Sequence, residues 1–258
     1  NGELYEYLTD EEKDVEKEIK NTEVASSDIA AELEKIVFDH VIRDRAIRYG
    51  ENRQDYPFSR KLDDRLFGRE SELAINIISP FHENAQNEDA IHVASVYRMD
   101  ELFVIMPSDE RLMRDVTIYK QTEKYVSQKF SNAQQDAVKR ILTDKGFRNR
   151  ERYADLQERV VNLMGSARLL VAGSEIEIAS GDPKARVERG FQELVTRAYP
   201  NLGMLRGVPY TENDIAKCLK RSERGLFGAE GDPLSEPERE LFAFIRNNSG
   251  GGVRTTLK

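Results

Sequence analysis

The chain has 258 residues, 39% of them hydrophobic, and a formal net charge of −8, so it can bury a core in one or two domains. The charge is uneven, because residues 1–34 hold twelve acidic side chains against three lysines, a balance of −9, which leaves +1 for the remainder. The acidity therefore excludes nonspecific polyanion binding for the N-terminal part only.

The cysteine content and the chain ends bear on the setting of the protein. The single cysteine, Cys218, precludes an internal disulfide and suits a reducing compartment. No apolar run has the length of a membrane span, so we expect a cytoplasmic protein without membrane contact. We also expect a piece of a longer protein. Residues 4–8 alternate as a strand that needs a partner, and residues 247–258 run through glycines toward a further helix.

The first helical signals follow directly. A helix is predicted over about residues 10–20, because Thr9 and Glu12 have the spacing of a capping box. Ser26 and Ser27 offer the N-cap of a second helix, whose apolar residues form one stripe.

The next part of the chain predicts a small sheet. Residues 49–69 are polar and aromatic, with glycine and proline punctuation, and are interpreted as a long connecting loop. Three short apolar runs then predict strands at 72–79, 90–97 and 101–106. We expect these strands to form a meander that is covered on both faces.

The second half of the chain has mainly helical periodicity. Predicted helices begin at Asp109 and cover 133–142 and 153–171, and a strand is predicted at 174–180. The 153–171 helix has a wide apolar face, which fits either the core of a bundle or a subunit contact. We favour the core for its central residue, Leu163.

Helix start signals continue to the C-terminal end. Asp182 followed by Pro183 predicts the N-cap and first residue of another helix. Two further helices are expected after Thr211 and Ser235, the latter with Glu238 as capping-box partner.

These elements together predict an α+β fold that is mainly α. A small buried meander sheet is followed by a helical, bundle-like region. The corresponding domain division places an α+β segment of acidic helices and short strands at residues 1–108 and a helical region at residues 109–258.

Patterns for catalysis or cofactor binding yield no assigned residue. The glycines of residues 247–256 lack the lysine of a phosphate-binding loop at the required offset, and a helix end with a linker is the favoured interpretation. His82 and His92 lie near carboxylates without metal-ligand spacing. Cys218 has no partner nearby in sequence. We therefore predict no catalytic, cofactor-binding or metal-binding residue.

Two basic stretches, residues 43–69 and 139–152, contain aromatic side chains and are candidates for nucleic-acid contact. Carboxylates dilute both stretches, so pairing with acidic groups of the same chain is the favoured interpretation. The candidate contact residues are Arg43, Arg45, Arg48, Arg60, Lys61, Arg148, Arg150 and Arg152.

Three strings carry a resemblance to a known family: YEYLTDEEKDVEKEIKNTEVASSDIAAELEKIVFD, DYPFSRKLDDRLFGRESELAINIISPF and TEKYVSQKF. They resemble the middle of the large P-loop ATPases of bacterial BREX phage-defence systems, the BrxC and PglY-like proteins. The likeness covers most of the chain. Its strings are typical of the family and are not catalytic signatures.

The resemblance implies a role for the chain. In that family the nucleotide-binding domain lies N-terminal to the part that this sequence resembles, so ATP and Mg²⁺ are expected only in the parent protein. The implied function is a non-catalytic interaction or relay segment of an antiviral ATPase, with other BREX components, a second copy of itself or DNA as partners. The alternative function is a nucleic-acid-binding module that uses residues 43–69 and 139–152.

Overall fold

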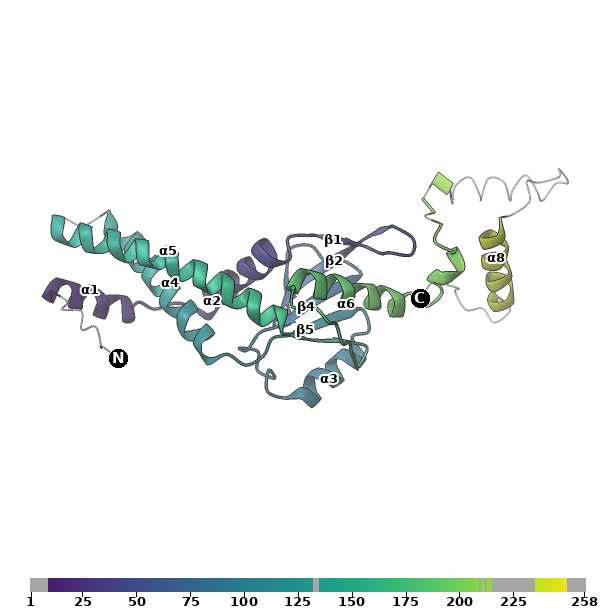
Figure 1. Ribbon diagram of the computed structural model, residues 1–258, viewed down its shortest axis with the longest axis horizontal. Coiled ribbons are helices and arrows are strands. Elements are labelled where there is room, and N and C mark those ends of the chain that lie inside the picture. The colour runs from purple at the N-terminus through teal and green to yellow at the C-terminus, as the bar shows by residue number, and fades with distance from the viewer. Residues whose placement is uncertain (1–8, 132–134, 209, 212, 215–234, 250–258) are drawn as a thin grey trace.

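The computed structural model describes residues 9–131, 135–208, 210–211, 213–214 and 235–249. Its fold is α+β and mainly helical, as predicted, with helices on both faces of one mixed sheet (Figure 1). No helix among these residues is long and apolar enough to cross a membrane.

Seven strands form the sheet. They span Ala46–Arg48 (β1), Asp55–Leu62 (β2), Arg65–Phe67 (β3), Leu73–Ile78 (β4), Glu101–Ile105 (β5), Arg168–Val171 (β6) and Ser174–Glu175 (β7). Their order is β1-β2-β4-β5-β6-β7, and β3 also pairs with β2. The β2–β4 and β4–β5 pairs are parallel, and the other pairs are antiparallel.

The helices differ widely in length. They span Asp10–Lys20 (α1), Ser26–Lys35 (α2), Glu88–Tyr97 (α3), Glu110–Phe130 (α4), Asp136–Gly165 (α5), Pro183–Ala198 (α6) and Glu236–Ser249 (α8), with a π-helix at Ile36–Val41 (η1) and a 3₁₀ helix at Leu202–Leu205 (η2). In β5, Leu102 and Val104 belong to the main core, whereas Phe103 packs in a second cluster with Ile91 of α3. Alternate residues of a strand therefore serve opposite faces of the sheet.

The main core lies on the face covered by α2, η1, α5 and α6. The other face is covered by α3, which lies below the sheet in Figure 1. Beyond the sheet, α4 and the first half of α5 form a helical hairpin, and α1 lies along it (Figure 1). We call α4 together with residues 136–152 of α5 the arm. Val15 and Ile19 of α1 pack there against Tyr125 and Leu142 in a small core of their own.

Several predicted helix starts are confirmed. Thr9 and Glu12 form the capping box of α1. Asp109 accepts backbone hydrogen bonds at the start of α4, and Asp182 does so for α6, which has Pro183 in its first turn. At α8, Ser235 and Glu238 exchange the two hydrogen bonds of a capping box. The prediction that Ser26 or Ser27 caps α2 is wrong, because both residues lie inside the helix and Ala25, which has no side-chain cap, precedes it.

The predicted meander is wrong in two respects. Residues 90–97 form most of α3 and not a strand, so β4 and β5 are joined through a helix and pair in parallel. The predicted loop at 49–69 holds β2 and β3, and β2 supplies the other parallel pair with β4. A helical crossover is the usual connection of parallel neighbours.

The boundaries of the second half also differ from prediction. Of the helices predicted at 133–142 and 153–171, residues 136–142 and 153–165 belong to one continuous α5 that ends at Gly165, and Arg168–Val171 form β6. β6 pairs with β5, so the sheet contains chain from both sides of residue 108. Of the strand predicted at 174–180, only Ser174 and Glu175 are extended in the sheet, as β7.

Some predictions fall outside the described residues. These are the strand at 4–8, the glycine stretch from residue 250 onward and Cys218. Of the helix expected after Thr211, the structure describes the start, where Thr211 donates both its backbone N–H and its hydroxyl to Asp214.

Candidate functional site

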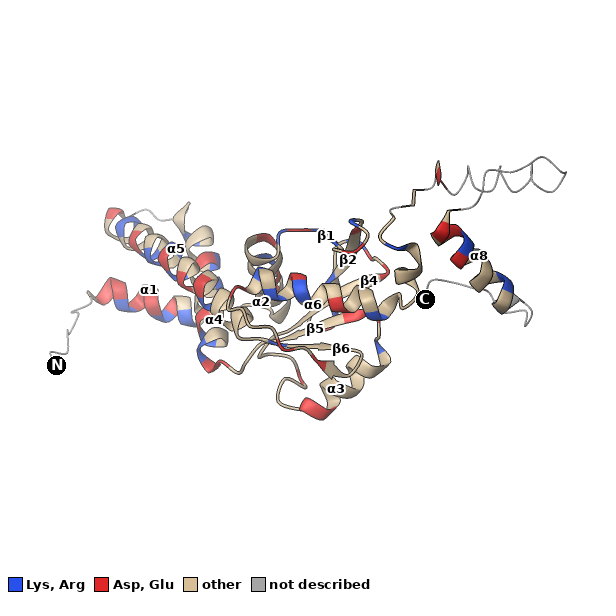
Figure 2. Ribbon diagram, turned by 45° about the vertical axis from the view of Figure 1, so that its right-hand side comes forward, with Lys and Arg blue, Asp and Glu red and all other residues tan. Residues whose placement is uncertain are grey.

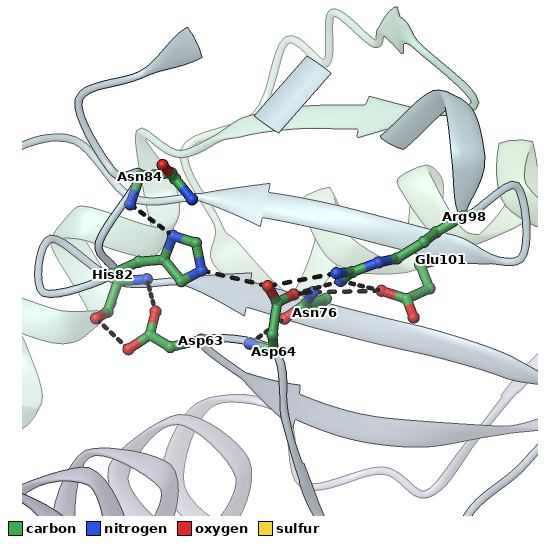
Figure 3. Close-up of polar contacts among 8 residues, drawn as sticks. Asp63, Asp64, Asn76, His82, Asn84, Arg98 and Glu101 are labelled. Atoms are coloured by element: carbon green, nitrogen blue, oxygen red, sulfur yellow. Dashed lines mark hydrogen bonds and ion pairs between the residues drawn. The ribbon is translucent and has the colours of Figure 1, made fainter. Parts of the chain in front are cut away.

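A polar cluster lies on the α3 face of the sheet, where the β2–β3 turn meets the segment between α3 and β5 (Figure 3). Asp63 and Asp64 are the two central residues of this turn, with φ of 49° and 65°. Positive φ at both positions is the geometry of a type I′ hairpin turn, and Asp is one of the few residue types that tolerate it. The turn aims both carboxylates at groups from later strands.

Asp64 is the centre of the cluster. Arg98, which follows α3, donates to both of its carboxylate oxygens, and Asn76 of β4 donates its Nδ2 to Asp64 Oδ1 over 2.7 Å. His82 Nε2 lies 3.3 Å from Asp64 Oδ2. Partial burial raises the pKa of Asp64, but the hydrogen bonds from Arg98 and Asn76 outweigh it and hold the pKa below its usual value.

The tautomer of His82 follows from its second contact. The backbone N–H of Asn84 donates to His82 Nδ1 over 3.2 Å, so Nδ1 is the acceptor. In the neutral ring the proton is therefore on Nε2, which donates to Asp64.

A second ion pair adjoins the first. Lys61 of β2 donates to Glu101 of β5, and the other oxygen of Glu101 accepts from Asn76 over 3.3 Å and lies 3.6 Å from Arg98. Glu101 and Asn76 are buried. Two carboxylates, Asp64 and Glu101, thus balance two cations, and of the four only the buried Glu101 requires such pairing.

Asp63 faces a different partner. Its carboxylate accepts from the backbone N–H and from the hydroxyl of Ser79, each over 2.7 Å. Burial raises the pKa of Asp63, and the two hydrogen bonds from Ser79 only partly offset it. Neither aspartate was predicted as a site residue, because residues 49–69 were interpreted as a loop. The signal was the pair itself, two turn-forming residues between apolar segments.

The cluster has a structural role, and we call it the lock. Its carboxylates, amide and cations pair with one another, which fixes the β2–β3 turn to the α3–β5 segment. Among the described residues, no group of His, Cys, Asp and Glu is arranged to hold a metal ion.

The first basic stretch is mostly engaged within the chain. Arg48 pairs with Asp55 over 2.9 Å, Arg60 lies 3.6 Å from Asp39 and Lys61 pairs with Glu101. Arg43 and Arg45 are exposed. The Arg43 Nε donates to the carbonyl oxygen of His40.

The second basic stretch lies on the arm, away from the first (Figure 1). Arg148 pairs with Asp144 over 3.0 Å, and Arg152 donates to Asn149 over 2.9 Å. Arg150 is exposed and its guanidinium lies 5.7 Å from the centre of the Phe147 ring. The structure thus does not bring the two stretches together in one surface, and nucleic-acid contact stays a prediction.

The comparison with protein families concerns most of the chain. Residues 22–194 match the family described as the BREX ATP-binding protein BrxC 4th domain with six-stranded beta sheet. This chain belongs to the BrxC family. It is therefore part of the BREX defence machinery, in agreement with the resemblance seen in the sequence. No solved structure matches the chain.

The residues matched by the BrxC family model contain the whole described sheet of this chain. All strands, from β1 to β7, lie within residues 22–194. The main path of the sheet contains six strands, and β3 is attached to its side. The polar cluster also lies inside the matched range, whereas α1 precedes that range and α8 follows it.

Proposed function

We propose that this chain is a non-catalytic interaction and relay segment of a BREX ATPase. The observation that carries the proposal is the continuity of α5, which joins two separate cores. Leu142 packs in the small core beneath α1, whereas Leu156, Val160 and Leu163 pack in the main core against the sheet. At 1.5 Å per residue, the 30 residues of α5 are about 45 Å long.

A helix that is anchored at both ends moves as one body. Displacement of the arm therefore changes how α5 packs on the sheet, and the reverse also holds. Binding and hydrolysis of ATP belong in this proposal to the parent protein, and this chain passes the resulting movement to other BREX components or to a second copy.

The attachment of α1 supports the relay. Glu16 pairs with Lys145 over 2.7 Å, and Glu18 accepts from the Tyr125 hydroxyl over 2.8 Å. The acidic α1, mostly red in Figure 2, therefore lies along the arm and pairs with it. A displacement of α1 is passed to the arm through these contacts.

A break in α5 tests the relay. Glu151 is exposed, and Glu151→Pro removes one helix hydrogen bond and bends α5 between the two cores, at a cost of about 3 kcal/mol. Glu151→Ala removes the same side chain and keeps the helix. We expect the parent ATPase with Glu151→Pro to bind ATP and to lose protection against phage, and Glu151→Ala to protect normally. The proposal is contradicted if the parent protein with Glu151→Pro is folded and still protects against phage as well as the unmodified protein.

A second candidate function is nucleic-acid binding by the arm. The observation that favours it is the exposed pair of Phe147 and Arg150, an aromatic ring beside a guanidinium, which can stack a base and neutralise a phosphate.

Salt dependence separates the two candidates. Reversal of charge at Arg148, Arg150 and Arg152 should weaken duplex binding and flatten its dependence on salt, by about one unit of slope for each lost phosphate contact. The control reverses three exposed basic residues elsewhere: Lys17, Arg189 and Arg239. Equal effects of both triple variants, or no duplex binding at all, contradict nucleic-acid binding.

A further inference from the structure

The outer face of α3 is apolar although it faces solvent. Val93 is 51% exposed, Val96 46%, Tyr97 84% and Met99, just beyond the helix, 58%. The inner face of the same helix is also apolar and packs on the sheet through Ile91. A cluster of exposed apolar side chains marks an interaction surface.

The surroundings of this surface are acidic. Residues 83–100 contain four acidic side chains and one basic side chain. Glu88, Asp89 and Asp100 are exposed, and Glu88 pairs with Arg168 over 2.7 Å, so Asp89 and Asp100 supply the acidic charge; the red patch on α3 in Figure 2 shows the acidic start of this helix. The one basic residue, Arg98, is engaged by Asp64 and Glu101. A partner of this surface should therefore be basic around an apolar or aromatic site.

The arm contains a site of that kind. A hollow of about 230 Å³ lies between α4 and α5, several times the roughly 30 Å³ that one water molecule occupies in the liquid. The rings of Tyr119 and Tyr153, stacked with centroids 5.0 Å apart, form part of its wall. Gly146, Asn149 and Arg150 line it from α5.

The exposed charge at the hollow is positive. Residues 110–152 hold eleven basic and six acidic side chains, but Lys120, Lys129 and Lys145 pair with acidic groups of the same chain and Glu123 also lines the hollow, so the charge that remains for a partner is that of Arg150. Arg150 is exposed at the hollow, and Lys35 Nζ lies 5.8 Å from the centre of the Tyr153 ring in its wall. A tyrosine that entered would find aromatic rings on one side and the exposed guanidinium of Arg150 for its hydroxyl.

We propose that Tyr97 of one copy inserts into the arm hollow of a second copy. Apolar neighbours of Tyr97 would cover the rim, and the acidic groups of α3 would face the basic arm. The arm and α3 point away from each other in one chain (Figure 1). The contact is therefore heterologous, each copy offering one surface to the copy before it and the other to the copy after it, so it builds rings or filaments. This inference rests on the proposed interaction function and names its partner.

Two variants test the two surfaces separately. Tyr97→Asp removes an exposed ring. Gly146→Leu fills the hollow, where a Cβ on Gly146 meets only Val126 at an ordinary 3.8 Å. We expect the chain to self-associate with rising concentration in sedimentation equilibrium, and each variant to weaken this association at least tenfold. Tyr97→Phe and Gly146→Ala, which keep the ring and the hollow, should associate as the unmodified chain does. So should Ile245→Asp, a change at an exposed apolar residue of α8.

Mixing the two variants decides the geometry. The Tyr97→Asp chain keeps its hollow and the Gly146→Leu chain keeps its tyrosine, so an equal mixture should form a dimer that stops there. An unmodified chain that stays monomeric up to roughly millimolar concentration, or a mixture without dimers, overturns the proposal. The relay is judged independently: loss of phage protection with Glu151→Pro in the parent would leave the relay intact even if no self-association occurs.

Discussion

Arg98 donates hydrogen bonds to both carboxylate oxygens of Asp64, and so ties the end of α3 to the turn after β2. These residues are 34 positions apart in the chain, and each comes from a connection between elements. The pair therefore holds together two segments that the hydrogen bonds of the sheet do not join.

Asp64→Asn tests this lock. The asparagine keeps the positive φ but loses the charge, so we expect the free energy of unfolding at neutral pH to fall by about 1 kcal/mol, a value discounted for partial exposure. The pKa of Asp64 is lower in the folded state, so its stabilisation is present above the unfolded pKa and disappears as pH falls through the folded pKa. Urea unfolding at a series of pH values should show the loss shrinking in acid. Asp100→Asn, an exposed neighbour, is the control.

Asp63→Asn should have the opposite pH signature. The folded pKa of Asp63 is raised, so its ionisation reduces stability as pH rises from the unfolded to the folded pKa. An asparagine can still accept from the Ser79 N–H, and its amide can donate to the Ser79 hydroxyl. We expect Asp63→Asn to be at least as stable as the unmodified chain at neutral pH, and its stability not to decrease between the unfolded and the folded pKa of Asp63. Asp63→Ala, which loses both bonds, should lose about 1–3 kcal/mol. Equal losses for the two variants would contradict the assignment.

Leu163→Asp should unfold the chain. Leu163 is 8% exposed and packs in the main core, which confirms the core placement of this helix position. Truncating such a leucine costs about 2–5 kcal/mol, and a buried carboxylate adds to this. Circular dichroism melting together with light scattering measures the outcome, with exposed Glu158→Ala on the same helix as control. A folded variant with unchanged melting temperature and mass would contradict the assignment.

Ile19→Asp should release α1 and leave the remaining fold in place. Only Val15 and Ile19 of α1 are buried, and their partners Tyr125 and Leu142 belong to a core separate from the sheet. Elements with few buried contacts open locally. Hydrogen exchange should therefore rise in residues 10–20 and stay low in the sheet. Lys17→Asp, at an exposed position of the same helix, should leave exchange unchanged. Uniform loss of protection would show that α1 is part of the main cooperative unit.

Two glycines of α5 should respond in opposite directions to alanine. A Cβ on Gly165 would lie 2.4 Å from the carbonyl oxygen of Gly181, so Gly165→Ala forces the backbones apart and should lower the melting temperature. A Cβ on Gly146 would meet Val126 at an ordinary contact distance of 3.8 Å, so Gly146→Ala should stabilise the chain by up to about 1 kcal/mol. Thermal unfolding of both variants tests the contrast, and a stabilising Gly165→Ala would contradict the close approach.

Local sequence determined the helix starts and the long apolar stripes. The caps at Thr9, Asp109, Asp182 and Ser235 were predictable because a cap needs only neighbours three or four residues away. The mainly helical α+β class followed from patterns of similarly short range, whereas the family came from the resemblance of three longer strings. Ala90–Tyr97 were wrongly predicted as a strand. Apolar residues occur on both faces of this helix, which removes the periodicity that separates a helix from a strand.

Tertiary structure decided the pairing and the polar cluster. Whether β4 and β5 are parallel depends on the crossover through α3, and β6 becomes a strand because it adds to the edge of β5. Asp64, Asn76, Arg98 and Glu101 are brought together by strand register, which no local pattern encodes. Their charges look like ordinary surface charges in sequence. Strand pairing buries Asn76 and Glu101 and places the partly exposed Asp64 and Arg98 against them, so the four residues depend on one another.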